Sequence, residues 1–184
     1  MKKSVGLVVM VMMPQKDGSE VMKAVLQRRG RFNTEKMAPE SYPGCCQVTT
    51  HGKLEEGEDF DLGLANELGE ELGQEFATTY CHGYHSEIVS EVKTTEKEVI
   101  TFGALMPLDA LKTIRLGPDS GGLVYVTAEQ MSKDNPDLVE LVPGEKGSVM
   151  DKMKIYGPVH TGTIAMFPDE IEAVRKAFEV FGKK

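Results

Sequence analysis

No stretch of this 184-residue chain approaches the roughly 18 consecutive apolar residues that a membrane-spanning helix needs. A first apolar run, Val5 to Met13, follows two lysines as the core of a signal peptide would. It has no small-residue cleavage site, however, and it leads into a turn at Pro14, Asp17 and Gly18. We interpret this run as a first strand. We therefore expect no membrane attachment and a cytoplasmic location.

Positive charge is also scarce, because 21 lysines and arginines face 29 aspartates and glutamates, for a formal net charge of −8. A general nucleic-acid or anionic-membrane surface needs a basic face, so neither partner is expected. Phosphorylated small molecules stay compatible with this balance, since a bound cation and a few local arginines can reverse the sign within a cleft.

Cysteine is rare as well. Cys45, Cys46 and Cys81 form no CxxC pair, and an odd number fits reduced thiols better than a disulfide framework. Cys81 is followed by His82, with His85 nearby, but a closed soft-metal site needs a fourth ligand that the spacing does not identify. Buried thiols and strand-edge histidines are the favoured interpretation.

The length and the hydrophobic content of 40% suit one well-buried core, so a single domain over residues 1–184 is expected. The patterns predict a mixed chain with strands at Val5 to Met13, Val21 to Arg29, Cys45 to Thr50, Tyr84 to Val92, Glu98 to Leu105 and Leu123 to Val126, and a short strand near Ile114. The segment Val142 to Phe167 is punctuated by glycine and proline and is left unassigned. A terminal helix is predicted from Pro168, with an apolar stripe of Ile171, Val174, Phe178 and Phe181.

Acidic residues are abundant, and many of them lie in the segment Gly52 to Gly73, GKLEEGEDFDLGLANELGEELG. At about 100° per residue, Glu67, Glu70 and Glu71 fall within an arc of roughly 100° on one face of a predicted helix. Like charges at these spacings destabilise an isolated helix, so we expect a bound divalent cation to offset their repulsion. The neighbouring face carries an apolar stripe for the core, formed by Leu64, Ala65, Leu68 and Leu72. Gly73 follows where a left-handed C-terminal cap is expected.

The other interpretation of this segment is a solvated, acid-rich surface helix. Such a helix has no need of a glycine-bounded loop ahead of it, or of Gly57 next to Glu58, whereas a loop-helix-loop metal platform does. Gly69 costs the helix about 1 kcal/mol relative to alanine, which indicates either a close approach by substrate or backbone, or neutral drift. The metal platform is therefore favoured.

The segment resembles the Nudix box, the signature of the Nudix hydrolase family, which reads Gly, five residues, Glu, seven residues, Arg-Glu-aliphatic-any-Glu-Glu-any-Gly-aliphatic. The matching positions are Gly52, Glu58, Glu67, Leu68, Glu70, Glu71 and Gly73. Two positions depart from the pattern, because Asn66 replaces the arginine and Gln74 replaces the final aliphatic residue. The arginine usually helps to orient a catalytic glutamate.

The resemblance implies an α/β (α+β) fold, an α/β/α sandwich around a mixed central sheet. It implies a pyrophosphohydrolase that depends on Mg²⁺ or Mn²⁺ and acts on a nucleotide sugar, an ADP-ribose or an NTP type of substrate. The implied metal ligands are Glu67, Glu70, Glu71 and the Gly52 carbonyl, with Glu58 assisting catalysis. Either Glu67 or Glu70 would be the base, or an acid from a later loop, for which the candidates are Asp119, Glu96 and Glu98.

Substrate phosphates need donors beyond the metal, and arginine forks match their geometry. Strand alternation points Arg28 and Arg29 to opposite faces, so at most one of them faces the cleft. Arg29 or Arg31 is the expected phosphate contact, and His51, beside the box glycine, is a further substrate-binding candidate.

Two other functions are compatible with the sequence. An enzyme similar to isopentenyl diphosphate isomerases would account for LQRR ahead of the box and for Cys46 in the preceding strand. A catalytically weak Nudix-fold domain that binds a nucleotide or a partner protein would account for Asn66. Many family members dimerise, so a homodimer is compatible with the resemblance, although no interface is visible in a single sequence.

Overall fold

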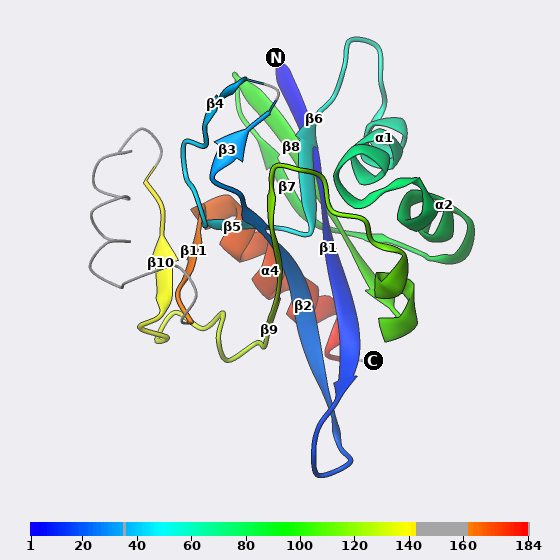
Figure 1. The fold of residues 1–184 in the computed structure, drawn as a ribbon, viewed down its shortest axis with the longest axis vertical. Coiled ribbons are helices and arrows are strands. Elements are labelled where there is room, and N and C mark those ends of the chain that lie inside the picture. The colour runs from blue at the N-terminus through cyan, green and yellow to red at the C-terminus, as the bar shows by residue number, and fades with distance from the viewer. Residues whose placement is uncertain (35, 143–161, 184) are drawn as a thin grey trace.

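A mixed sheet runs through the middle of the molecule, in the order β5-β2-β1-β8-β7, with β6 pairing to β1 and β9 to β2 (Figure 1). The computed structural model describes residues 1–34, 36–142 and 162–183. The strands of this sheet are β1 (Lys2–Pro14), β2 (Glu20–Arg29), β5 (Cys46–Gln47), β6 (Thr50–Lys53), β7 (Glu87–Lys93), β8 (Lys97–Met106) and β9 (Ser120–Val126). Strand β1 is antiparallel to β2 and β6 and parallel to β8, which makes the sheet mixed.

Helices cover both faces of the sheet (Figure 1). They are α1 (Phe60–Leu72), α2 (Gln74–Gly83), the 3-10 helix η1 (Leu108–Thr113) and α4 (Pro168–Phe181). Two small two-stranded sheets flank the main one, formed by β3 (Phe32–Asn33) with β4 (Ala38–Pro39), and by β10 (Leu138–Glu140) with β11 (Ile164–Met166). The predicted α/β/α sandwich around a mixed central sheet is confirmed.

The central strand β1 explains why the core has two halves. Its residues alternate between the faces, so Leu7 and Val9 pack with α1 and α2, while Val8 and Met10 pack with α4. All four side chains have no exposed surface. A continuous apolar run of this kind is what a strand covered on both faces requires.

Hydrogen bonds fix both ends of helix α1. The carboxylate of Asp59 caps its first turn by accepting a hydrogen bond from the N–H of Leu62 at 2.8 Å. At the other end, the N–H groups of Arg115 and Gly117 donate to the carbonyls of Leu72 and Glu71, at 2.7 and 3.1 Å. These bonds satisfy terminal carbonyls that a helix leaves without intrahelical partners.

Several predicted boundaries were wrong. Gly73 has a positive φ of 93°, but its ψ of 150° lies outside the left-handed helical region, because the chain turns there directly into the unpredicted helix α2. The segment before Ile114 is the 3-10 helix η1 instead of a strand.

The predicted strand from Cys45 to Thr50 is divided into β5 and β6, because Thr49 bonds across to the backbones of β1 and β2. Of the unassigned segment, residues 143–161 lie outside the described part of the chain, and β11 follows them. Within the described residues, none of the helices is long and apolar enough to cross a bilayer.

Candidate functional site

The predicted acidic face of α1 packs on strand β6, and the tightest approach is between Glu67 and Gly52. A Cβ atom added to Gly52 would lie 1.7 Å from the Cδ atom of Glu67. Any side chain at position 52 would therefore displace the Glu67 carboxylate. The box glycine leaves a space that this carboxylate occupies, which is a specific reason for a glycine there.

The environment of Glu67 strongly alters its protonation. Burial, together with the charges of Glu71 and Glu70, raises the pKa of Glu67 to about 7, although a hydrogen bond from the backbone of Lys53 opposes the shift. The charge of Glu58 acts in the same direction as the other acids. The acids of the Nudix-box segment, Glu58, Glu67, Glu70 and Glu71, are called the box acids below. Their negative charges repel one another, as the helical spacing predicted.

Glu71 lies deeper and is tied to the sheet. Its Oε2 atom accepts hydrogen bonds from the hydroxyl of Thr50 and, at 3.3 Å, from the N–H of His51. Burial raises the pKa of Glu71, and the bonds from Thr50 and His51 oppose that shift. The nearby side chain of Gln47 also lowers the pKa of Glu71. Glu70, by contrast, is exposed to solvent.

Glu58 sits in the loop before α1 and is held by the residue that departs from the family pattern. The Nδ2 atom of Asn66 donates to Oε1 of Glu58 at 2.6 Å, and the N–H of Glu55 donates to Oε2 at 2.8 Å. The loop and the helix are therefore joined at the position where the family has an arginine.

The donor set fits a hard divalent cation. Within the part of the chain that the structure describes, no three acidic, histidine or cysteine side chains already converge as a closed metal centre. Mg²⁺ keeps several waters and needs only one or two carboxylates, so an open set is sufficient. Carboxylate oxygens are the ligands it prefers, and the mutual repulsion that raises the pKa of Glu67 would be relieved by a cation.

The three substrate-binding candidates lie in different surroundings. Arg29 pairs with Glu40 at 3.6 Å, and its charge also acts on Glu71 and Glu170. Arg31 is exposed in the loop after β2. His51 lies opposite Gly6, so alternation turns its side chain away from α1.

Burial and the charge of Arg29 lower the pKa of His51 to about 4, although Asp169 opposes them. The structure therefore brings only the backbone of His51 to the box acids, and at neutral pH its ring is uncharged.

The three candidate bases that follow the box in the sequence, Asp119, Glu96 and Glu98, make contacts with other parts of the chain. Both carboxylate oxygens of Asp119 lie 3.0 Å from the N–H of Thr34. Glu98 pairs with Lys93 at 2.8 Å, and this contact lowers the pKa of Glu98. Glu96 is exposed in the turn between β7 and β8, where its carbonyl accepts the N–H of Lys2 at 2.9 Å.

Two residues beside Glu71, Thr50 and Gln47, were not identified from the sequence. The sequence did contain a signal for Thr50. This residue ends a predicted strand and lies two residues before Gly52, and alternate residues of a strand share a face, so Thr50 and Gly52 should both face the helix. Gln47 carried no comparable signal, because its contact depends on how β5 packs.

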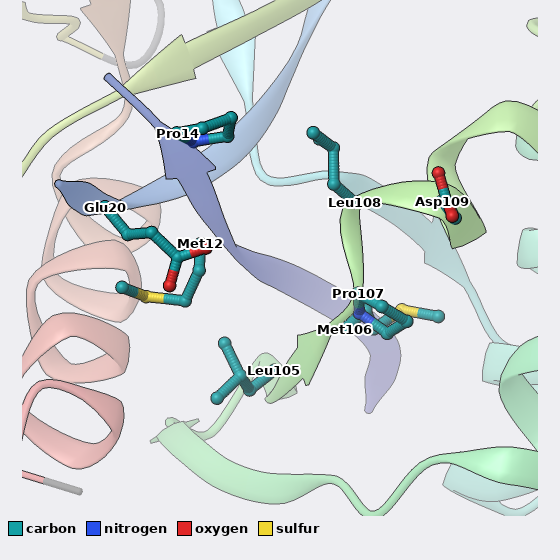
Figure 2. A pocket seen from close by; sticks show the side chains of 8 residues that line it. All are labelled: Met12, Pro14, Glu20, Leu105, Met106, Pro107, Leu108 and Asp109. Atoms are coloured by element: carbon teal, nitrogen blue, oxygen red, sulfur yellow. The ribbon is translucent and has the colours of Figure 1, made fainter. Parts of the chain in front are cut away.

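A pocket of about 450 Å³ lies at the far end of β1 (Figure 2). It is lined by Met12, Pro14, Glu20, Leu105, Met106, Pro107, Leu108 and Asp109. Val5 pairs with Gly52, and Met12 lies seven residues further along the same strand, or about 23 Å at the usual rise. This pocket is therefore separate from the acidic face.

No protein-family model and no curated protein sequence matches the chain. Its structure is similar to a mutT/nudix family protein from Listeria innocua, at 15% identity and a TM-score of 0.61, over 99% of this chain and 94% of that one. It is similar to a MutT/nudix family protein from Enterococcus faecalis, at 13% identity and a TM-score of 0.53, over 100% of this chain and 62% of that one.

A further similar structure is the NUDIX domain of Shewanella oneidensis NrtR complexed with ADP ribose, at 11% identity and a TM-score of 0.52. The match covers 97% of this chain and 86% of that chain. The chain therefore has the Nudix fold, as the resemblance of its acidic segment to the Nudix box implied.

Proposed function

We propose that the chain is a divalent-metal-dependent hydrolase that cleaves the phosphoanhydride bond of a nucleoside diphosphate linked to another moiety. The observation that carries the proposal is the Glu67 carboxylate above Gly52, with a pKa raised to about 7 by burial and by Glu71 and Glu70. A solvated surface helix would not confine a carboxylate in this way.

The box acids differ in their surroundings, which supports a division of roles. A general base works best when its pKa lies near the working pH, so Glu67 is suited to accept the proton of the attacking water. Glu71 is fixed to the sheet and Glu70 faces solvent, so both are available as metal ligands together with the carbonyl of Gly52. A bound Mg²⁺ or Mn²⁺ would neutralise phosphate charge and lower the pKa of a bound water.

The substrate class is a small-molecule diphosphate, and ADP-ribose is the first compound to test. The NrtR domain with a similar fold was crystallised with that molecule. The chain's own cationic candidate is Arg31, which is exposed next to β3, whereas Arg29 is already paired with Glu40. Arg31 is therefore the preferred phosphate contact.

The isomerase alternative loses its main support. Cys46 is only 1% exposed, and burial raises the pKa of its thiol to about 11. Such a thiol is shielded from substrate. The binding-domain alternative rested on the loss of the arginine, but Asn66 still bonds to Glu58. Catalysis is therefore the better-supported use of the site.

The test is phosphate release from nucleotide sugars, ADP-ribose, nucleoside triphosphates, dinucleoside polyphosphates and prenyl diphosphates, with Mg²⁺ or Mn²⁺ and a coupled phosphatase. Glu70→Gln should abolish the metal-dependent release. Glu75→Gln removes an exposed acid at the start of α2 and is the matched control, which should keep wild-type activity. Metal binding without any release across the panel would contradict a hydrolase and favour the binding domain.

A further inference from the structure

Thr49, just before β6, and Thr50, the first residue of β6, are completely buried and have different partners. Thr49 and Thr50 both have no exposed surface. The Oγ1 atom of Thr49 accepts the N–H of Val9 at 2.8 Å and donates to the carbonyl of Val25 at 2.5 Å. Thr49 therefore joins the backbones of β1 and β2. Neither of these two hydrogen bonds involves a carboxylate.

Thr50 instead donates its hydroxyl to Oε2 of Glu71. The two residues are 21 positions apart in the sequence, so this bond joins the sheet to the last turn of α1. The N–H of His51 reaches the same oxygen at 3.3 Å. One carboxylate oxygen therefore receives two donors from successive residues of β6.

A second line of contacts reaches the same carboxylate from β5. The side chain of Gln47 lies close enough to Glu71 to lower the pKa of that carboxyl, and its Nε2 atom donates to Oε1 of Gln27 at 3.0 Å. Gln27 and Gln47 are 5% and 6% exposed. A buried, connected set of hydrogen bonds holds its members in one arrangement, because breaking any bond would leave a buried polar group unsatisfied.

Glu71 is thus oriented by the sheet, whereas Glu70, its neighbour on the same helix, is exposed. We propose that Thr50 is a positioning residue, which fixes the orientation of the Glu71 carboxylate for a divalent cation on the acidic face of α1. The inference rests on the proposed function, because it assigns a role toward the metal of that same site. Outer partners that orient a metal ligand typically contribute 10- to 100-fold to metal affinity.

The experiment measures Mn²⁺ binding to the full chain by isothermal titration calorimetry, without substrate, beside thermal unfolding of each variant. Thr50→Val keeps the β-branched shape and removes the hydroxyl, and it should weaken Mn²⁺ binding by about tenfold or more. Thr50→Ser restores the hydroxyl and should restore the affinity. Gln47→Leu removes a different polar neighbour of Glu71 and should weaken binding in the same direction, which keeps the test decisive if Thr50→Val does not fold.

Thr49→Val is the matched control. It removes a hydroxyl of the same kind from the neighbouring position, so it should lower the unfolding temperature while leaving the Mn²⁺ affinity unchanged. Wild-type affinity in both Thr50→Val and Gln47→Leu, or equal losses in Thr49→Val and Thr50→Val, would overturn the positioning role. Absence of Mn²⁺ binding by the wild-type protein would instead contradict the proposed function itself.

Discussion

The Nδ2 atom of Asn66 donates a hydrogen bond to Oε1 of Glu58 at 2.6 Å, so α1 holds the loop that precedes it. An arginine at this position would hold Glu58 and also cancel its charge. The amide holds Glu58 but leaves the negative charge in place, and that charge is one of those that raise the pKa of Glu67. This substitution therefore preserves the loop contact and makes the site more negative.

Replacement of Asn66 should separate these two effects. Asn66→Ala removes the loop contact, and we expect kcat/KM to fall by roughly 10- to 100-fold as Glu58 loses its position. Asn66→Arg keeps a donor and adds a positive charge, so it should lower the pKa of Glu67. The acidic limb of the pH profile of kcat/KM should then move to lower pH. A wild-type kcat/KM in Asn66→Ala would show that the contact has no role in turnover, and an unchanged pH profile in Asn66→Arg would show that the charge at this position does not act on Glu67.

The space above Gly52 gives a second prediction. Gly52→Ala would place a methyl group 1.7 Å from the carboxyl carbon of Glu67, and the flexible side chain would have to swing away. We expect loss of turnover with a nearly unchanged unfolding temperature, measured by the phosphate-release assay and thermal unfolding.

Gly83→Ala is the control for Gly52→Ala. A Cβ at position 83 would meet no atom within 4 Å, so this variant should bind and turn over as the wild type does. Full activity in Gly52→Ala would mean that the position of Glu67 above the glycine is not needed for function.

The acidic face of α1 could be predicted because its signals are local. The helical spacing of Glu67, Glu70 and Glu71 and the glycine that ends the helix, Gly73, all lie within one segment. Helix α2 follows Gly73 at once, so its start has no separating loop, and the pattern after Gly73 did not reveal it.

The partners of the site residues could not be predicted in the same way. Arg29 and Arg31 were chosen by their nearness to the box, but the pairing of Arg29 with Glu40 depends on the path of the loop between β2 and β5. The bond between Thr50 and Glu71 joins a strand to a helix across 21 positions. Such contacts depend on packing between elements, and residue spacing along one element does not encode them.

The buried Glu170 in the first turn of α4 predicts a pH-dependent stability. Burial raises its pKa to about 7 from an ordinary 4.5, although the charge of Arg29 opposes the shift and Asp169 adds to it. Between these pH values the folded chain holds a proton that the unfolded chain has lost. The free energy of unfolding therefore falls as the pH rises from 4.5 to 7, by about 3 kcal/mol for this group.

Glu170→Gln removes this contribution, so the wild-type protein should lose stability relative to the variant across that pH range. Urea unfolding at several pH values without metal measures the difference in the free energy of unfolding between the two proteins. Glu67 and His51 also titrate, but both proteins contain them, so their contributions cancel in this difference. Glu172→Gln, an exposed acid on the same helix, is the control and should give a constant difference. A constant difference for Glu170→Gln as well would show that Glu170 stays ionised.

Asp119, a candidate base in the sequence, is expected to anchor the β3–β4 hairpin instead. Both of its carboxylate oxygens lie 3.0 Å from the N–H of Thr34, and its carbonyl accepts the N–H of Gly30 at 2.6 Å. Asp119→Asn keeps an acceptor for Thr34 but cannot act as a base, so kcat should stay within a few-fold of wild type. Asp119→Ala removes the acceptor and should raise KM, through Arg31 at the start of the hairpin, and speed hydrogen exchange at the Thr34 amide. A base would instead make both variants lose kcat equally, so one pair of substitutions decides between the two roles.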